Sequence, residues 1–296
     1  MADPEALFMP DGDGFVATEL ARGPWDPNAL HGGPVAALLA RAAERHDSGP
    51  AHFVTRLTVE LYRPVPMGRL VLDATTVRPG RRVQWIDVTM RAGDHDGPVV
   101  AGVHALRVER TETARYDVGP SAEPPGVTMP CSPDDLPPAP LGLTGLVGFW
   151  SATEVRIATG DWERAGPGSG WLRLHVPVVA GEEPTAIERV VAAADFASGV
   201  GNPVRMADAG TINAELSVHV HRPAIGEWIG LDARAWAHGE GGGLSEAVIH
   251  DREGPIGRSA QALVLIEAGP WVAREREARE ARERREAQSS SSSSSS

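Results

Sequence analysis

Two stretches of the chain repeat one pattern of apolar and polar positions. The first runs from Leu57 to Pro64 (LTVELYRP) and the second from Leu216 to Pro223 (LSVHVHRP), so a constant shift of 159 residues superposes them. Strict alternation of apolar and polar residues predicts a half-buried β-strand. Each strand is expected to end at its proline, because proline has no N–H to donate to a strand ladder.

Further matches extend the repeat beyond these strands. Asp73 corresponds to Asp232 at the same shift, and Gly97-Pro98 corresponds to Gly254-Pro255 at a shift two residues shorter. A period this long, present only twice, predicts a duplicated domain rather than a solenoid. We expect an N-terminal unit over residues 1–110, a linker over 111–143, a C-terminal unit over 144–270 and a tail over 271–296.

The two halves also share an order of elements. Residues 34–45 (PVAALLARAAER) are rich in strong helix formers and have one apolar face, and residues 187–196 predict a second Ala-rich helix. Strands are predicted at residues 15–20, 99–108, 153–158, 171–176, 212–221, 228–236, 244–250 and 256–266. Each half is therefore strand, helix, then several antiparallel strands, which is an α+β arrangement.

Charge and cysteine content narrow the possible partners. The net charge is −12, and every fixed side-chain cation is Arg because the chain has no Lys. Scattered Arg residues on an acidic chain offer no basic stripe for a phosphate backbone, so we expect no nucleic-acid partner. The single cysteine, Cys131, rules out an internal disulfide and is typical of a reducing cytosol. With no signal-like start and no apolar run of about 20 residues, we expect a cytoplasmic protein without a membrane span.

Four segments carry a resemblance to a known family. They are His31-Gly32-Gly33-Pro34 before the first helix, AAADFASGV (192–200), INAELSVHVHRP (212–223) and GPIGRSAQALV (254–264). In order and spacing they resemble the double-hotdog, TesB-type acyl-CoA thioesterases. The resemblance implies two tandem hotdog units, each an antiparallel sheet wrapped around a long helix. It also implies hydrolysis of an acyl-CoA substrate to free acid and CoA, no metal or other cofactor, and self-association as a homodimer.

The resemblance assigns three residues to the attacking water. In the family this water is held by an Asp, a Thr or similar polar residue, and a Gln. The matching positions here are Asp195, Asn213 and Gln261. Asn213 departs from the family pattern, because an amide presents a different set of donors and acceptors from a hydroxyl.

The start of the first helix offers the other part of a site. The glycines of His31-Gly32-Gly33 allow a substrate to approach the backbone, and the unpaired N–H groups and helix dipole there would stabilise an oxyanion. The second half has Gly181-Glu182-Glu183-Pro184 in this place. Conversely, Val54 and His104 of the first half stand opposite the Asn and the Gln of the second. Each half keeps one part, which predicts a composite site between the two units.

Each of these features also has a simpler structural explanation. Asp195 would close an Ala-rich helix, Gln261 would face solvent or a sheet partner, and the two glycines would give the helix start a flexible backbone. His219 and His221 lie two apart on one strand face, an arrangement that can bind zinc, but no third ligand with suitable spacing appears.

Two other functions stay open. A hotdog protein can bind acyl-CoA or acyl-carrier chains without hydrolysing them. An enoyl-CoA hydratase uses the same fold, although the sequence has no Asp and His pair at short spacing after an Asn-Pro loop. Covalent catalysis has no support, because no G-x-S-x-G turn occurs and Cys131 lies in the linker. In the tail, residues 274–286 predict a solvated helix of paired Arg and Glu, followed by a low-complexity serine run over 289–296.

Overall fold

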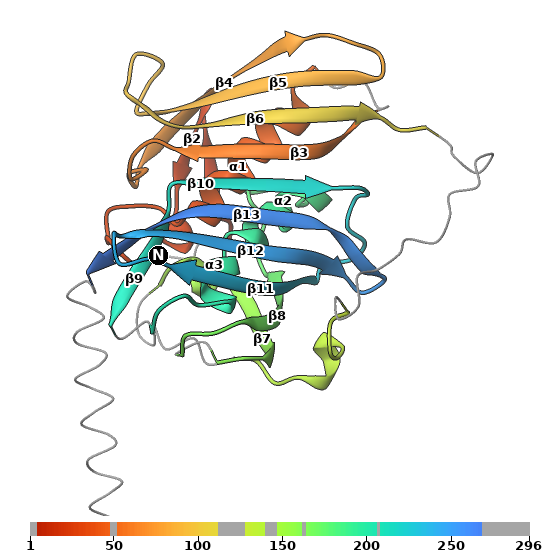
Figure 1. The fold of residues 1–296 in the computed structure, drawn as a ribbon. Helices are drawn as coiled ribbons and strands as arrows, with labels where there is room; N and C mark the ends of the chain where they lie inside the picture. The colour runs from red at the N-terminus through yellow and green to blue at the C-terminus, as the bar shows by residue number, and fades with distance from the viewer. Residues whose placement is uncertain are drawn as a thin grey trace, which may run out of the picture.

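The computed structural model describes residues 5–47, 52–111, 128–139, 147–161, 164–205 and 208–267. In this part of the chain thirteen strands form one antiparallel sheet, and the α-helices lie against one of its faces (Figure 1). The first half contains β1 (Phe8–Asp11), β2 (Gly14–Ala17), η1 (Glu19–Ala21), α1 (Gly32–Arg45), β3 (His52–Leu61), β4 (Arg69–Arg78), β5 (Val83–Ala92) and β6 (Val99–Glu109). The second half contains η2 (Pro133–Asp135), η3 (Phe149–Ser151), β7 (Thr153–Thr159), β8 (Gly168–Leu174), α2 (Ala186–Ala194), α3 (Ala197–Val200), β9 (Ala209–Asn213), β10 (Glu215–Val220), β11 (Ile229–Ala237), β12 (Gly242–Asp251) and β13 (Gly254–Glu267).

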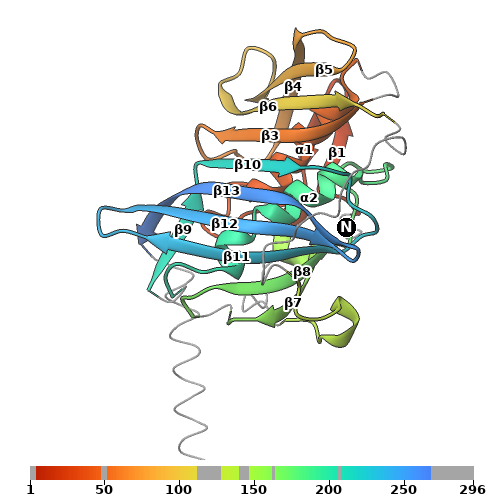
Figure 2. The same cartoon turned by 45° about the vertical axis from the view of Figure 1, so that its right-hand side comes forward.

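Strand order is the same in both halves when followed outward from the middle of the sheet. The first half gives β3-β6-β5-β4-β2-β1, and the second gives β10-β13-β12-β11-β8-β7, with β9 paired to β13. Figures 1 and 2 show the two half-sheets joined at β3 and β10, with α1 and α2 on the same side of both. The predicted α+β class and the duplication are confirmed.

The joint between the halves lies on a local two-fold axis. β3 and β10 pair antiparallel, with Thr58 opposite Ser217, and the pairs on either side of it exchange equivalent positions of the two repeats. Thr58 and Ser217 are 159 residues apart, and their hydroxyl oxygens lie 3.4 Å from each other. The shift that superposes the repeats in the sequence is therefore a rotation about this pair in space.

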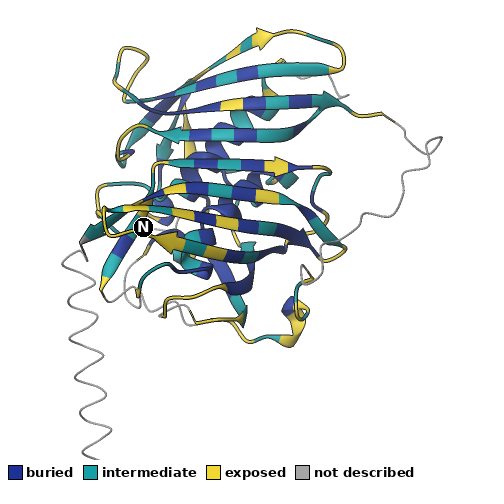
Figure 3. Cartoon of the chain, in the orientation of Figure 1, coloured by how far each residue is buried: buried dark blue, intermediate teal, exposed yellow. Residues whose placement is uncertain are grey.

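The core lies between the inner face of the sheet and the helices. Figure 3 shows the burial concentrated on the helices and on alternating strand positions. Leu38 and Leu39 of α1 and Val191 of α2 are completely buried. Small residues let the two helices approach closely, since a Cβ added at Gly33 would lie 3.0 Å from the carbonyl oxygen of Ala192. This close packing brings the start of α1 to the end of α2.

Some predicted elements differ locally from the structure. The helix predicted over 187–196 ends at Ala194, because the amide of Phe196 bonds to a carbonyl three residues back and the short α3 then follows. The strand predicted over 212–221 is divided into β9 and β10 at Ala214. At Ala214 the backbone bonds to two different strands. Its amide donates to the carbonyl of Ala262 on β13, and its carbonyl accepts from the amide of Leu61 on β3. The predicted strand over 15–20 ends at Ala17, where η1 begins after one residue. The predicted tail helix and serine run lie outside the described residues.

A buried arginine holds the far end of α1. Arg107, on β6, is 1 % exposed. Its Nη1 donates to the carbonyl oxygens of Ala43, Glu44 and His46, and its Nη2 donates to the Gln84 side chain at 2.6 Å. A cation at a helix C-terminus pairs with the negative end of the dipole and satisfies carbonyls that have no partner in the helix. Arg107 thereby ties the end of α1 to the sheet.

A buried carboxyl group on α2 makes the stability of the fold depend on pH. Glu188 is 2 % exposed. Burial raises its pKa to about 7; the charge of Arg45 opposes this shift, and that of Glu44 adds to it. A group whose pKa is raised on folding contributes fully below its unfolded pKa and loses that contribution as the pH rises through the folded value. Wild-type stability should therefore decline between the ordinary Glu range and about pH 7.

We expect Glu188→Gln to stabilise the protein at pH 8 and to change little near pH 4, because glutamine cannot ionise. The shift in pKa corresponds to roughly 3 kcal/mol at most. Urea unfolding at both pH values measures the effect. Glu182→Gln is the matched control, because hydrogen bonding to Arg41 lowers the pKa of Glu182 and its loss should instead destabilise the protein at pH 8. Equal effects of Glu188→Gln at the two pH values would contradict the assignment.

Candidate active site

A cavity of about 470 Å3 opens between the two halves beside the start of α1. The first half contributes the loop before α1, the start of α1 and the end of β3, and the second half contributes the end of α2, α3 and β9. Most of the wall is apolar, including Trp25, Leu30, Val35, Leu61, Trp150, Phe196 and Ile212. The ionisable side chains on the polar side of the described lining include Asp26, His31, Arg63 and Asp195.

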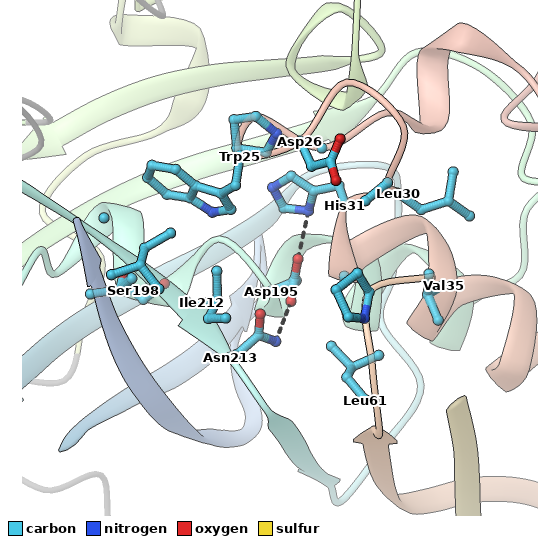
Figure 4. Close-up of a pocket in the computed structure, with 18 of the residues that line it drawn as sticks. Trp25, Asp26, Leu30, His31, Val35, Leu61, Asp195, Ser198, Ile212 and Asn213 are labelled. Carbon is cyan, nitrogen blue, oxygen red and sulfur yellow. Dashed lines mark hydrogen bonds and ion pairs between the residues drawn. The ribbon is translucent and has the colours of Figure 1, made fainter. Parts of the chain in front are cut away.

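Asp195 is the centre of the polar groups in this wall. It follows the last residue of α2, and its side chain is 2 % exposed. One carboxylate oxygen, Oδ2, lies 2.6 Å from Nδ1 of His31, and the other, Oδ1, accepts a hydrogen bond from Asn213 Nδ2 at 2.7 Å. Figure 4 shows His31 and Asn213 on either side of this carboxylate. An anion at the C-terminus of its own helix is unfavourable, but here it lies at the positive N-terminus of α1.

His31 is the N-cap of α1, and its ring is held on several sides. The ring centroid lies 5.0 Å from that of Phe149 and 5.1 Å from that of Phe196. These two phenylalanine rings stack on each other at 5.2 Å. The His31 side chain is 16 % exposed and lines the cavity. Its position is therefore fixed, while one edge of the ring remains accessible.

The proton between His31 and Asp195 can be assigned from distance. Nδ1 lies 2.6 Å from Asp195 Oδ2 and 3.2 Å from the amide nitrogen of Gly33. One ring nitrogen cannot donate to the first and accept from the second. Lone pairs of a nitrogen and a carboxylate at 2.6 Å would repel each other, so we place the hydrogen on Nδ1, donated to Asp195. In the neutral form of the ring, this leaves the lone pair on the other nitrogen, Nε2.

The structure brings the other predicted site residues near Asp195 in different ways. Asn213 ends β9 and lines the cavity. Gln261 is completely buried on β13 and is not among the residues that line the cavity. Its Nε2 donates to the backbone carbonyl of Asp195 at 3.2 Å, and its Oε1 has no hydrogen-bond partner among the described residues. Gln261 therefore stabilises the end of α2 through the Asp195 backbone and does not line the cavity.

The two glycines after His31 have separate structural reasons. A Cβ built on Gly32 would lie 2.6 Å from Asp195 Oδ1, so only glycine leaves room for the carboxylate. A Cβ built on Gly33 would lie 2.6 Å from the ring of Phe149, at the contact between α1 and α2. The simpler explanation, a flexible helix start, is not needed, because both positions are crowded.

The equivalent place in the other half is closed by an ion pair. Arg41 and Asp195 each stand ten residues after the N-cap of their helix. Arg41 donates to both carboxylate oxygens of Glu182, from the loop before α2, at 2.5 and 2.6 Å. The cavity on this side, which includes Val54 and Arg222, has about 170 Å3. The two halves were predicted to keep different polar residues, and the contacts of Arg41 and Asp195 differ accordingly.

The described part of the chain offers little support for metal binding or for catalysis by Cys131. It contains no group of three metal-ligating side chains, and His219 points from β10 as an exposed residue. The carbonyl of Cys131 accepts from Trp171 Nε1, away from the cavity lining. No helix within the described ranges has the length and hydrophobicity to cross a bilayer.

Two hotdog units sharing one sheet, with a site between them, define a double-hotdog protein. Solved structures of this shape are similar over nearly their whole length. A hotdog-fold protein of unknown function from Alicyclobacillus acidocaldarius is 20% identical, with a TM-score of 0.64, and the match covers 88% of this chain and 96% of that chain. A TesB protein of Mycobacterium avium subspecies paratuberculosis is 16% identical, with a TM-score of 0.59 and coverage of 87% and 95%. The acyl-CoA thioesterase II TesB2 of Mycobacterium marinum is 18% identical, with a TM-score of 0.58 and coverage of 81% and 90%.

Sequence families identify the chain more closely. The acyl-CoA thioesterase N-terminal domain matches residues 21–108, and the acyl-CoA thioesterase C-terminal domain matches residues 131–265. The chain belongs to this double-hotdog acyl-CoA thioesterase family. No curated protein matches the chain.

Sequence reasoning missed part of the site. It predicted a composite site with Asp195 close to the helix start at His31-Gly32-Gly33, but it assigned His31 to the substrate and predicted no direct contact with the carboxylate. It gave no role to Phe149 or Phe196. The available signal for His31 was its place immediately before two glycines at a helix start, which is an N-cap position. A contact between residues 164 positions apart leaves no local pattern in a sequence.

We expect Gly32→Ala to lower catalytic turnover by about 100-fold while unfolding at nearly the wild-type temperature, because its methyl group displaces the Asp195 carboxylate. Turnover of an acyl-CoA and thermal unfolding measure the two effects. Gly33→Ala should instead cost about 1–3 kcal/mol of stability, because its methyl group meets Phe149 and the backbone of α2. A fully active Gly32→Ala would show that the carboxylate position is unimportant.

Proposed function

We propose that the protein is a hydrolase that converts an acyl-CoA thioester and water into a free acid and CoA. The observation that carries the proposal is the Asp195 carboxylate, held by His31 and Asn213 in the wall of an apolar cavity at the N-terminus of α1. A carboxylate in such a place supplies basicity for water, and the helix start supplies donors for the oxyanion. Family membership supports the same reaction class.

In this proposal the two halves contribute different parts of the reaction. Water activated through Asp195 attacks the thioester carbonyl carbon, and the first-turn amides at Gly32 and Gly33 stabilise the negative charge on the carbonyl oxygen. Collapse of the tetrahedral intermediate breaks the C–S bond and releases CoA as the thiol. Asn213 keeps the carboxylate in place through its hydrogen bond to Oδ1, and Gln261 acts by holding the end of α2.

The cavity also suggests how each end of the substrate is held. Its apolar wall suits the acyl chain, because burial of each CH2 group is worth about 0.8 kcal/mol. Arg63 is the exposed cation of the lining and has no ion-pair or hydrogen-bond partner among the described residues. Arg222, its equivalent at the shift of 159, is instead bound to the buried Asp251 at 2.8 Å. We therefore assign Arg63 to the phosphates of CoA.

A second candidate reaction is hydration of an enoyl-CoA. The observation that favours it is the direct contact between His31 and Asp195, a pair able to move a proton to or from water. Binding of acyl-CoA or acyl-carrier chains without turnover is the third candidate. Thiol release, loss of the ultraviolet absorbance of an enoyl thioester, and binding without either change distinguish the three.

Association into a homodimer stays a prediction. Three exposed apolar residues lie on neighbouring strands, with exposed fractions of 43 % for Val264, 43 % for Leu244 and 50 % for Trp236. Leu244 pairs with Trp236 on one side and with Ala262, two residues before Val264, on the other, so the three side chains share one face. Contiguous exposed apolar groups of this kind favour contact with another protein surface.

We expect purified protein to release free thiol from acyl-CoA, and Asp195→Asn to lower the rate by roughly 1,000-fold, because an amide lacks the negative charge on which proton transfer from water depends. Thiol release across a series of acyl chain lengths measures this. Gln261→Ala should lower turnover less, because its contact is with the Asp195 backbone. Asp73→Asn is the matched control, because Asp73 is an exposed residue of β4 that does not line the cavity. This variant should keep full activity. A fully active Asp195→Asn would contradict the mechanism.

For Arg63→Gln we expect a KM for acyl-CoA about tenfold higher with kcat unchanged, because the loss is confined to binding. The same variant should hydrolyse an acyl-N-acetylcysteamine thioester, which has no phosphates, at the wild-type rate. Arg258→Gln, an exposed arginine on β13, is the control. A parallel loss on both substrates would assign Arg63 to the acyl end or to folding.

A further inference from the structure

We infer that His31, rather than Asp195, takes the proton from the attacking water, and that Asp195 orients the imidazole and stabilises its charge. This inference rests on the proposed hydrolysis of a thioester. It adds a second group to the proton transfer and makes the reaction depend on a pair drawn from both halves of the chain.

The first reason is that the Asp195 carboxylate is almost unexposed and each of its oxygens already has a short polar contact within the protein. Its side chain is 2 % exposed, and its two oxygens are occupied by His31 and Asn213 at 2.6 and 2.7 Å. A general base must lie within hydrogen-bond reach of the proton that it removes. The carboxylate therefore offers a water in the cavity less accessible surface than the ring of His31 does.

The second reason is that His31 is more accessible than Asp195. Its ring lines the cavity and is eight times more exposed than the Asp195 carboxylate, at 16 % against 2 %. With Nδ1–H donated to Asp195, Nε2 is the acceptor of the neutral ring, and the polar contacts of the ring with described residues are at Nδ1. A carboxylate that fixes the tautomer and orientation of an imidazole is the arrangement by which histidine acts as a base in many hydrolases.

The third reason is that the neighbouring residues restrict the rotation of the His31 ring and allow it to carry a positive charge. Phe149 and Phe196 lie against the ring and restrict its rotation. Asp195 is in contact with the histidine, and the other charged residues of the described cavity lining are Asp26 and Arg63. A cation at the N-terminus of α1 would by itself be unfavourable. The adjacent Asp195 carboxylate offsets this cost, which favours a transient imidazolium.

The proton balance of the step is complete. As the water oxygen bonds to the carbonyl carbon, one water proton passes to His31 Nε2 and the carbonyl electrons move to its oxygen. When the intermediate collapses, the C–S electron pair leaves on sulfur, and the imidazolium returns its proton to the CoA sulfur. The products are a carboxylic acid and a thiol, and His31 is neutral again.

His31→Asn tests the inference, because asparagine is a good N-cap and keeps the helix start. We expect kcat/KM for acyl-CoA hydrolysis to fall at least 100-fold with an unchanged unfolding temperature. The ascending limb of the pH profile of kcat/KM should disappear from the residual activity. His46→Asn, at the opposite end of α1, is the matched control and should keep both the rate and the limb.

His31→Gly adds a readout that a purely structural role would not move. Glycine is tolerated at an N-cap, and added imidazole should restore hydrolysis in proportion to its concentration. Asp195→Asn should show no such rescue. If the wild type hydrolyses acyl-CoA and His31→Asn does so within about threefold with the limb intact, His31 is not the base and the inference alone is overturned. If the wild type releases no thiol from any acyl-CoA, the proposed function itself fails.

Discussion

The pairing of β3 with β10 is the constraint on which the rest of the molecule depends. It joins two half-sheets into one, and its two-fold axis passes between Thr58 and Ser217. An axis of this kind makes α1 and α2 antiparallel neighbours, so the start of each helix faces the end of the other. A site at such a junction has a helix dipole from one half and side chains from the other. Neither half contains the whole arrangement.

The side chains at the two helix junctions, where the start of one helix faces the end of the other, differ in burial and charge. At one junction a carboxylate is retained, with a histidine and an amide bound to it and glycine leaving room for its oxygens. At the other, Arg41 replaces the carboxylate and meets Glu182 in a two-point ion pair. Burying a charged group is costly unless it is hydrogen-bonded or paired. The Asp195 carboxylate is hydrogen-bonded by His31 and Asn213, and Arg41 is paired with Glu182. Only the first junction places an imidazole in the wall of the larger cavity.

Sequence reasoning recovered the elements whose evidence is local or repeated. Alternation over residues 57–64 and 216–223, together with the shift of 159, was enough to predict both central strands and the duplication. The division of the predicted strand into β9 and β10 at Ala214 could not be predicted from the sequence, because it depends on which strand lies beside each backbone group. Asp195 and Asn213 were placed by motif order and do meet, whereas the cavity does not include Gln261. His31 was selected for its place in the chain, but its contact with Asp195 is a product of helix packing that no sequence window contains.

The closed junction at Arg41 and Glu182 has a consequence for binding stoichiometry. Two identical hotdog units would offer two equal sites, and occupancy of one could influence the other through the shared sheet. Here one junction carries an ion pair of the protein itself and a cavity of only about 170 Å3, against about 470 Å3 at the other. We therefore expect each chain to titrate with one ligand. Any cooperativity in the response to substrate would have to arise between chains rather than within one.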